Sequence, residues 1–283
     1  MNVLVTGATG FIGNHLIEEI LKSQTEISIT ATSRRVDKAK TSSWYGKVSY
    51  VECNLSEKSN HEKLFKGIDL MIHLAWDGLP NYEELFHFEK NVLDNYFFIK
   101  SAVSAGVNKI VVAGTCFEYG MVDGALKEGM VTNPSNPYGL AKDTLRKFLV
   151  ELQKRHQFQY NWIRLFYIYG EGQNERSFYS QLKNALRNGK SSFNMSGGEQ
   201  LRDYMRVEEV AGCIKKIALQ KKIGGVVNCC SGIPVSVRSL AERIIKESGK
   251  TIKLNLGFYP YPEFEPMAFW GDNTLLNKII ADD

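Results

Sequence analysis

The sequence lacks the features that mark membrane, metal-dependent and disulfide-stabilised proteins. No apolar stretch approaches the roughly 18 residues of a membrane-spanning helix, and the first apolar run is too short for a leader peptide. The five histidines are scattered without metal-ligand spacing, so we expect no metal site. The five cysteines are odd in number and form no C-x-x-C pair, which favours reduced thiols and a cytoplasmic protein.

The chain also lacks a strong excess of one charge and any dense run of lysine and arginine. Its formal net charge is +4, and 43% hydrophobic and 23% charged residues are ordinary globular proportions. A nucleic-acid partner is therefore not expected, because such proteins gather basic residues on one face. A weak positive charge still suits a small anionic substrate.

Strands and helices alternate along the first half of the chain. Short apolar runs predict strands at 1–6, 27–32, 48–52, 69–74, 109–114 and 160–165. Apolar residues at helical spacing predict helices at 11–21, 57–65, 83–105 and 138–156. This alternation predicts an α/β fold with a parallel, doubly wound sheet, in which residues 1–165 form a dinucleotide-binding Rossmann domain.

The second half is less regular. Helices are predicted at 176–188, 208–220 and 237–248, a strand at 226–229, and irregular structure at 255–269. We expect residues 166–283 to form mainly a smaller substrate-binding lobe, partly interleaved with the first domain. A cleft should lie between the two, at the carboxyl ends of the strands, where ligands bind in such folds.

A glycine-rich turn, V-T-G-A-T-G-F-I-G, joins the first strand to the first helix. Gly7 permits the tight turn, Gly10 lets backbone N–H groups approach a pyrophosphate, and Gly13 lets the helix pack closely on the sheet. The helix N-terminus also favours the negative charge of phosphates. A purely structural turn is the alternative, but the strand-to-helix setting favours a dinucleotide site. The predicted contacts in this turn are Gly7, Thr9, Gly10, Phe11, Ile12 and Gly13.

The end of the second strand lacks the acidic residue that would bind a ribose 2′-hydroxyl. The residues there are Ser33, Arg34 and Arg35, and the first acid is Asp37. Basic residues suit a 2′-phosphate, so the sequence favours NADP(H) over NAD(H), with NAD(H) as the other option. The alternative is that both arginines belong only to a solvated loop.

Residues 136–142 read N-P-Y-G-L-A-K and contain a Y-x-x-x-K motif at the start of a predicted helix. The spacing places Tyr138 and Lys142 on one face of that helix. A lysine ammonium near a tyrosine hydroxyl favours the phenolate and lowers its pKa, which suits proton transfer near neutral pH. The motif alone arises by chance in most proteins, but here it follows a dinucleotide-binding turn and a strand that ends in Thr115.

Several different motifs are distributed along nearly the whole chain. They are G-A-T-G-F-I-G (7–13), I-H-L-A (72–75), G-T-C-F-E-Y-G (114–120), N-P-Y-G-L-A-K (136–142), I-R-L-F-Y-I-Y-G (163–170), L-R-D-Y-M-R-V-E-E-V (201–210) and N-C-C-S-G (228–232). Together they resemble the extended short-chain dehydrogenase/reductases of the NAD-dependent epimerase/dehydratase family. The resemblance implies an NAD(P)-dependent oxidoreductase that acts on a nucleotide sugar.

The resemblance also implies roles for particular residues. Thr115 would hydrogen-bond the reacting oxygen, Tyr138 would give or take the proton, and Lys142 would hold the nicotinamide ribose. Asn54 and Leu55 stand where an acidic and an apolar residue usually contact adenine. The implied cofactor contacts outside the glycine turn are Ser33, Arg34, Arg35, Asn54, Leu55, Leu74, Ala75, Trp76, Tyr138, Lys142 and Phe166.

The implied substrate contacts are Trp76, Tyr82, Cys116, Phe117, Tyr167 and Arg202. Arg202 would bind the substrate diphosphate with its guanidinium fork, or else form an ion pair with Asp203 or another neighbour. Trp76 and Tyr82, in the W-D-G-L-P-N-Y loop, would stack over the substrate, although core packing is the alternative for Trp76. Cys116 either touches substrate or fills space in the core.

Departures from the family pattern narrow the reaction. Cys116 and Phe117 stand where sugar-nucleotide 4,6-dehydratases carry an Asp-Glu pair, so the acid and base of water elimination are absent. Glu118 comes one residue late and is expected to point elsewhere on an extended segment. Tyr167 replaces an asparagine that is common in epimerases.

These features favour NADP(H)-dependent reduction of a nucleotide-linked, in particular dTDP-linked, 4-keto-6-deoxyhexose at C4, for surface polysaccharide synthesis. The loop at 76–82 also resembles that of reductases that make dTDP-fucose or dTDP-6-deoxytalose. A nucleotide-sugar 4-epimerase with tightly bound NAD is the second interpretation, and a non-catalytic dinucleotide sensor is the third. The resemblance implies a homodimer formed through the helices at 83–105 and 138–156. The nucleotide base, the sugar and the stereochemistry at C4 stay open.

Overall fold

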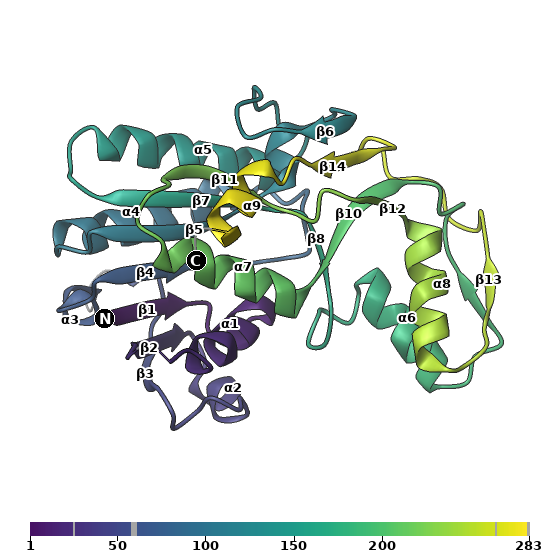
Figure 1. Ribbon diagram of the computed structural model, residues 1–283, viewed down its shortest axis with the longest axis horizontal. Coiled ribbons are helices and arrows are strands. Elements are labelled where there is room, and N and C mark those ends of the chain that lie inside the picture. Colours follow the sequence, from purple (N-terminus) through teal and green to yellow (C-terminus); the bar gives the residue numbers. More distant parts are fainter. Residues whose placement is uncertain (25, 58–60, 264, 282–283) are drawn as a thin grey trace.

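Parallel strands form the centre of the computed structural model, which is described for residues 1–24, 26–57, 61–263 and 265–281 (Figure 1). Within these residues a seven-stranded sheet has the order β11-β7-β5-β4-β1-β2-β3. Its strands are β1 (Asn2–Thr6), β2 (Ser28–Ser33), β3 (Ser49–Glu52), β4 (Leu70–His73), β5 (Lys109–Thr115), β7 (Gln159–Leu165) and β11 (Gly225–Cys229). Every neighbouring pair is parallel, which confirms the predicted sheet.

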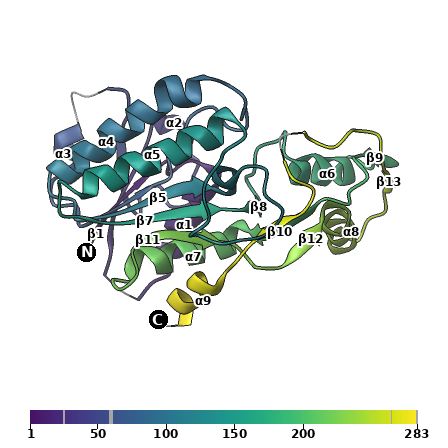
Figure 2. The same ribbon diagram turned by 90° about the horizontal axis from the view of Figure 1, so that it is seen from above.

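Helices cover both faces of this sheet, and each face has its own apolar core (Figure 2). One core includes residues of α3 (His61–Phe65), α4 (Val92–Ser104) and α5 (Pro137–Gln153). The other includes residues of α1 (Phe11–Leu21), α2 (Val36–Lys40), α7 (Val207–Leu219) and α9 (Thr274–Ala281). Burial on both faces explains why the central strands are continuous apolar runs and do not alternate with polar residues.

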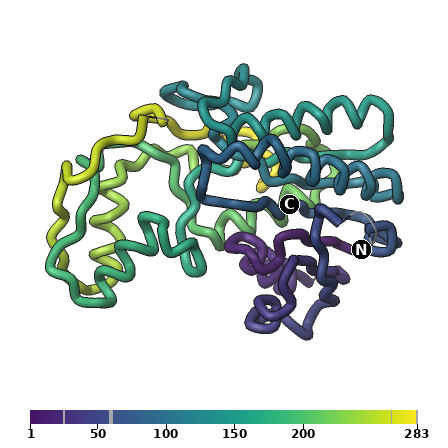
Figure 3. Tube along the Cα trace, turned by 180° about the vertical axis from the view of Figure 1, so that it is seen from behind, coloured from purple at the N-terminus to yellow at the C-terminus, as the bar shows by residue number. Residues whose placement is uncertain are grey.

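A smaller lobe is built on two amphipathic helices, α6 (Phe178–Arg187) and α8 (Val237–Ser248). Their apolar sides meet in a core that contains Leu182, Leu186 and Leu240. The parallel pair of β9 (Ser192–Asn194) and β13 (Lys253–Asn255) lies beside this core. Figure 3 shows the lobe at one end of the molecule, away from the N-terminus.

Two short sheets join the lobe to the large body. One contains β8 (Tyr167–Tyr169), β10 (Leu201–Arg206) and β12 (Pro234–Ser236), and the other pairs β6 (Gly124–Leu126) with β14 (Phe269–Gly271). β8 begins two residues after β7 ends, so the chain passes from the carboxyl edge of the large sheet directly into the lobe.

The chain crosses between the two bodies more than once. α7, β11 and α9 all follow residue 166, yet α7 and α9 pack in a core of the large sheet and β11 is its edge strand. Residues 166–283 are therefore divided between both bodies. Irregular structure was expected at 255–269. The first residue of this segment is the last of β13, and its last residue is the first of β14.

The helix expected at 83–105 differs from the observed structure. Turns extend to Leu85, a π-helical turn covers His87–Asn91, and α4 then runs to Ser104. Tertiary hydrogen bonds account for this, because the Asn91 amide donates to the Asp77 carbonyl (3.0 Å) and His87 bonds the preceding loop. The helix expected at 57–65 falls partly on residues 58–60, outside the described residues. α2 and α9 were not predicted because they are too short for a clear period.

No described helix is long and apolar enough to cross a membrane. The described residues also contain no group of three or more His, Cys, Asp or Glu side chains that could hold a metal ion. All five cysteines fall within the described ranges and are free thiols. The cytoplasmic location stays a prediction.

Candidate active site

A cavity of about 1310 Å³ lies along the carboxyl ends of the parallel strands and extends into the smaller lobe. Its walls include the turn after β1, the ends of β2 and β4, and residues of α6, β9 and β10. The volume exceeds the roughly 300–1,000 Å³ that usually holds one small ligand. The cavity therefore has room for a dinucleotide and a second ligand.

The glycine turn forms one wall of this cavity. Gly7 has a φ of +69°, and a Cβ there would lie 2.8 Å from the Ala75 backbone nitrogen. A Cβ at Gly13 would lie 2.3 Å from the Gly7 carbonyl oxygen. Gly10 begins α1 without a side-chain cap, which leaves the first N–H groups of the helix available to a ligand. This close turn against an uncapped helix end fits the pyrophosphate of a dinucleotide.

Most of the predicted cofactor contacts line the cavity. They are Gly7, Thr9, Gly10, Phe11, Ile12, Gly13, Ser33, Arg34, Arg35, Asn54, Leu55, Leu74, Ala75 and Trp76. Phe166 does not line it and packs instead with Cys116 and Phe269 in a separate core. Its neighbour Tyr167 lines the cavity, because adjacent side chains of an extended segment point to opposite sides.

The two predicted 2′-phosphate ligands lie at the cavity wall and are both paired with acids. β2 ends at Ser33, and the Arg34 guanidinium then donates to both Asp77 oxygens, at 2.8 and 3.0 Å. Arg35 donates to Asp37 at 2.7 Å. Both pairs are exposed, and exposed ion pairs contribute little free energy, so a phosphate can compete for either arginine.

Thr115, Tyr138 and Lys142 lie together beneath the cavity wall. Thr115 ends β5, and the other two are one turn apart on α5. Their exposed fractions are 5%, 7% and 2%, and none of the three lines the cavity. Trp76 and Tyr82 do line it, with ring centroids 6.0 and 5.5 Å from that of Tyr138. The predicted catalytic residues are thus brought together under an aromatic cover.

Burial determines the protonation of the tyrosine and the lysine. Burial raises the pKa of Tyr138 far above its ordinary value, while the nearby Thr115 side chain acts in the opposite direction. Burial also lowers the pKa of Lys142 to about 7. The expected lowering of the tyrosine pKa by the lysine is wrong. The ammonium lies 5.9 Å from the Tyr138 ring centroid, and desolvation has the larger effect.

The Lys142 ammonium has two close contacts. It donates to the Ala113 carbonyl at 2.8 Å, and it lies 3.8 Å from the centroid of the Trp76 ring. These contacts give the ammonium a defined position beside Trp76.

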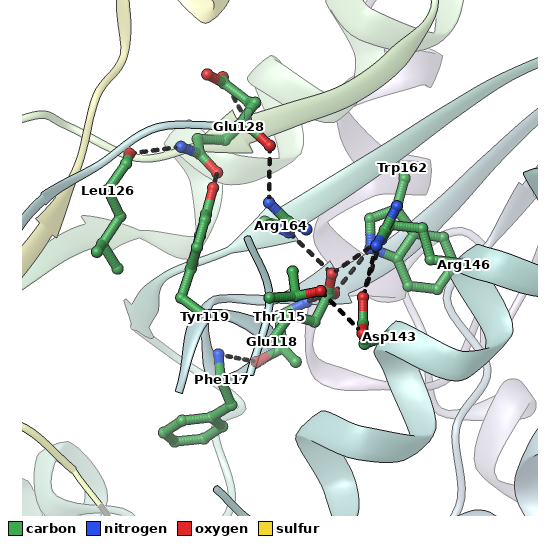
Figure 4. A network of polar contacts seen from close by, with 12 residues as sticks. Thr115, Phe117, Glu118, Tyr119, Leu126, Glu128, Asp143, Arg146, Trp162 and Arg164 are labelled. Carbon is green, nitrogen blue, oxygen red and sulfur yellow. Dashed lines mark hydrogen bonds and ion pairs between the residues drawn. The ribbon is translucent and has the colours of Figure 1, made fainter. Parts of the chain in front are cut away.

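Thr115 is held by the carboxylate of Glu118 (Figure 4). One carboxylate oxygen accepts from the Thr115 N–H at 2.9 Å and from the Trp162 indole at 2.7 Å. The other accepts from Arg164 Nε at 2.8 Å and lies 3.7 Å from Arg146 Nε. Burial raises the pKa of the Glu118 carboxyl, and Arg164 opposes that rise. The network joins β5, β7 and α5 at the residue that would bind the reacting oxygen.

The expected extended segment after Thr115 is wrong, although Glu118 does point away from the cavity. Residues Cys116–Tyr119 form a 3₁₀ turn, in which the Thr115 side chain accepts from the Phe117 N–H at 3.3 Å. Glu118 completes a capping box with Thr115, and this local pairing favours the turn over a strand. Cys116 is buried in the core beside Phe166, and burial raises the pKa of its thiol.

The predicted substrate contacts divide into two groups. Trp76, Tyr82, Tyr167 and Arg202 line the cavity, whereas Cys116 and Phe117 do not. The Phe117 ring still touches this wall from behind, with centroids 5.2 Å from Tyr82 and 6.4 Å from Tyr167.

Arg202 is buried and already paired. Its Nε and Nη2 donate to one Glu265 oxygen, at 3.2 and 2.8 Å, and its Nη1 donates to the carbonyls of Leu201 and Met267. The alternative role for Arg202 was an ion pair with Asp203 or another neighbour. The observed partner is Glu265, and the Asp203 side chain accepts instead from Ser231 and Gly232. A substrate diphosphate would therefore have to displace or share Glu265.

Sequence reasoning did not select Asp77, His87 or Glu265. The first pairs with Arg34, the second with Trp76, and the third with Arg202. Glu265 lies in the aromatic, proline-rich segment near the C-terminus, where no periodic pattern indicated a function. For His87, the sequence offered one signal, which is its position between the aromatic residues Phe86 and Phe88.

A family model described as NAD dependent epimerase/dehydratase family matches residues 3–230. The dTDP-6-deoxy-L-talose 4-dehydrogenase (NAD(+)) of Aggregatibacter actinomycetemcomitans is 30% identical over 275 residues, which are 96% of this chain and 99% of that protein. The dTDP-4-dehydro-6-deoxyglucose reductase of Escherichia coli is 28% identical over 257 residues, 86% of this chain and 80% of that protein. MoeE5 in complex with UDP-glucuronic acid and NAD has a TM-score of 0.85 and 26% identity, covering 99% of this chain and 93% of that one.

Replacing Glu118 by glutamine should destabilise the protein by about 3–5 kcal/mol, because it leaves Arg164 buried without its charge partner. The neutral amide also cannot accept from all the donors that the carboxylate serves. Urea denaturation measures the change. Glu151→Gln is the matched control, because Glu151 forms an exposed ion pair with Lys154 at the end of α5, and its replacement should cost well under about 1 kcal/mol. Equal midpoints for the two variants would contradict the assigned role of Glu118.

Replacing Lys142 by methionine should stabilise the ligand-free protein by about 1–3 kcal/mol at pH 6. The pKa of Lys142 falls from 10.5 in the unfolded chain to about 7 in the folded one. The cost of burying the ammonium is therefore complete below about pH 7 and declines as the pH rises toward 10.5. The gain should accordingly be smaller at pH 9, as thermal unfolding at the two pH values can measure. A variant that is less stable than the parent at both pH values would refute this electrostatic account.

Proposed function

This chain belongs to the NAD-dependent epimerase/dehydratase family, and we propose that it reduces a dTDP-linked 4-keto-6-deoxyhexose at C4 with NADP(H). The family assignment confirms the resemblance read from the motifs. The chain is an NAD(P)-dependent enzyme that modifies nucleotide sugars. The reaction, the sugar and the preference between the two cofactors are our proposals.

The observation that carries the proposal is the tyrosine–lysine–threonine cluster without a dehydratase acid and base beside it. Cys116 and Phe117 occupy those two positions, and burial raises the pKa of the Cys116 thiol. Glu118 is committed to Arg164 and Trp162 on the far side of Thr115. Water elimination therefore lacks its catalytic groups, whereas carbonyl reduction needs only a hydride donor and one proton donor.

The protonation of Tyr138 suits the donor role. Burial raises its pKa, so the phenol carries its proton at neutral pH. A nicotinamide, when bound, would supply the hydride for C4. Tyr138 gives its proton to the oxygen that develops negative charge there, and the Thr115 hydroxyl stabilises that charge by a hydrogen bond. Lys142 would hold the nicotinamide ribose, and solvent would later return the proton to Tyr138.

The named relatives support the choice of substrate. The A. actinomycetemcomitans protein is a dTDP-6-deoxy-L-talose 4-dehydrogenase, and the E. coli protein is a dTDP-4-dehydro-6-deoxyglucose reductase. The first name describes oxidation of a dTDP-linked 6-deoxysugar at C4. The second describes reduction of a dTDP-linked 6-deoxysugar that is a 4-dehydro sugar. The predicted use in surface polysaccharide synthesis follows from that product class and stays a prediction.

The purified protein should oxidise NADPH when given dTDP-4-keto-6-deoxyglucose. Tyr138→Phe should lower kcat by about 10²–10⁴-fold, because it removes the proton donor. Loss of NADPH absorbance measures the rate, and Tyr45→Phe, at an exposed surface position, is the control. Consumption of neither NADPH nor NADH would exclude this reductase. Retention of NAD through purification, with interconversion of nucleotide sugars, would then favour the 4-epimerase, and cofactor binding without any turnover would favour the sensor.

Cofactor preference should depend on the pair between Arg34 and Asp77. Arg34→Ala should weaken NADPH binding by about 10–100-fold with little effect on NADH, because one charge-assisted bond to the 2′-phosphate is lost. Asp77→Asn should strengthen NADPH binding, since it releases the guanidinium that Asp77 now engages. Fluorescence titration measures both constants. Tighter binding of NADH than NADPH, unchanged in Arg34→Ala, would support the solvated-loop alternative.

We also propose a homodimer formed through α4 and α5. Their outer surfaces expose Leu93, Leu140 and Phe148, and the two helices pack side by side through Tyr96 and Phe148 (5.3 Å between ring centroids). Adjacent exposed apolar side chains of this kind mark interaction surfaces. Sedimentation at micromolar concentration should show a dimer that Phe148→Arg dissociates. A monomeric parent protein would count against it.

A further inference from the structure

Trp76 is held on two sides by residues that are far apart in the sequence. Its indole N–H donates to Nδ1 of His87 at 3.1 Å, and the two rings are nearly parallel, with centroids 6.2 Å apart and an interplanar angle of 20°. The Lys142 ammonium lies 3.8 Å from the indole centroid. Trp76 therefore lies between the histidine and the lysine and contacts both.

The hydrogen bonds define the tautomer of His87. An indole N–H can only donate, so Nδ1 must be the acceptor and carry no proton. The Asn81 carbonyl can only accept, and it lies 2.8 Å from Nε2, so Nε2 must carry the proton. His87 is completely buried, which makes a loss of either bond costly. The arrangement requires a neutral imidazole with its proton on Nε2.

The same histidine connects this contact to the smaller lobe. The Asn81 side chain accepts from Arg176 Nη1 at 3.2 Å, and Arg176 lies in the loop before α6. The Tyr138 N–H donates to the Tyr82 carbonyl at 3.1 Å, so the next residue of the loop is tied to the start of α5. His87 thus hydrogen-bonds the loop that covers the proposed catalytic residues at two points, Trp76 and Asn81.

We propose that His87 is a positioning residue, which holds Trp76 against the Lys142 ammonium and so fixes the lysine where the cofactor ribose must meet it. This inference rests on the proposed function for the role of Lys142. The observed geometry of His87 is independent of the proposed function. Neither His87 nor this use of Trp76 follows from the motifs of the family resemblance.

The charges around both groups agree with this role. The titratable groups that face His87 are Lys142, Tyr138, Glu84 and Asp77, and burial lowers the pKa of His87, which keeps it neutral at pH 7. The Lys142 ammonium is surrounded by the Ala113 carbonyl, Trp76, Tyr138, and the side chains of Glu118, His73 and His87. The face of an indole stabilises a cation, so a displaced Trp76 should make the lysine lose its proton more easily.

Nuclear magnetic resonance of the ligand-free protein tests the geometry without any cofactor or substrate. With ¹⁵N-labelled histidine, the His87 signals at pH 7 should be those of a neutral imidazole protonated on Nε2. The Trp76 indole N–H, assigned by its absence in Trp76→Phe, should exchange slowly with solvent. An imidazolium, or a proton on Nδ1, would overturn the proposal.

Three variants separate positioning from packing. His87→Phe keeps a flat ring but loses both hydrogen bonds, His87→Asn keeps an acceptor where Nδ1 was, and His156→Phe, past the end of α5, is the matched control. His87→Phe should weaken NADPH or NADH binding by about 3–30-fold and shift the alkaline limb of that binding down by about half to one pH unit. His87→Asn should restore much of both, and His156→Phe should change neither. Circular dichroism confirms that each variant is folded.

The outcomes distinguish this inference from the proposed function. Cofactor binding and its pH dependence require no sugar, so a protein that fails to reduce the dTDP-sugar can still show the effect. Folded His87→Phe with unchanged cofactor affinity and an unchanged alkaline limb would overturn the proposal. The proposal would also be overturned if His87→Asn bound the cofactor as weakly as His87→Phe. The acceptor for the Trp76 indole N–H would then have no effect on cofactor binding.

Discussion

The buried carboxylate of Glu118 connects the chemistry of this protein to its fold. It accepts from the backbone of Thr115, from the Trp162 indole and from the Arg164 guanidinium, and none of these donors reaches solvent. An unpaired charge at this depth would cost several kcal/mol, so the donors are held together or lost together. The threonine that would bind the reacting oxygen is therefore positioned by a network whose anchors lie in β7 (Figure 4).

A second consequence of burial concerns Tyr138 and Lys142, the tyrosine and lysine proposed as catalytic. Both side chains lie beneath Trp76 and Tyr82, where removal from water favours the neutral form of each. A phenol that keeps its proton is prepared to donate it, which agrees with reduction of a carbonyl better than with a tyrosinate base. The lysine keeps a partial charge near neutral pH, because burial lowers its pKa to about 7 and the negative charge of Glu118 opposes that effect.

The basic residues that flank the cavity carry their own counter-ions. Arg34 pairs with Asp77 and Arg202 with Glu265, so phosphate groups of a cofactor or substrate would bind by competition with carboxylates. The two pairs differ in strength, because the first is exposed and the second is buried with additional hydrogen bonds to backbone carbonyls. Selectivity for a phosphate should thus be adjusted more easily at Arg34 than at Arg202.

The sequence by itself determined the parallel sheet, the glycine turn and the pairing of Tyr138 with Lys142, because these depend on periods and spacings within single segments. It could not show that Trp76 and Tyr82 cover the proposed catalytic residues, that Phe166 faces away from the cavity, or that Glu265 and Asp77 pair with the arginines. Those facts depend on contacts between segments distant in the chain, whose partners no local pattern specifies. Only the tertiary structure decided them, since desolvation and charge pairing act on whichever groups the fold brings into contact.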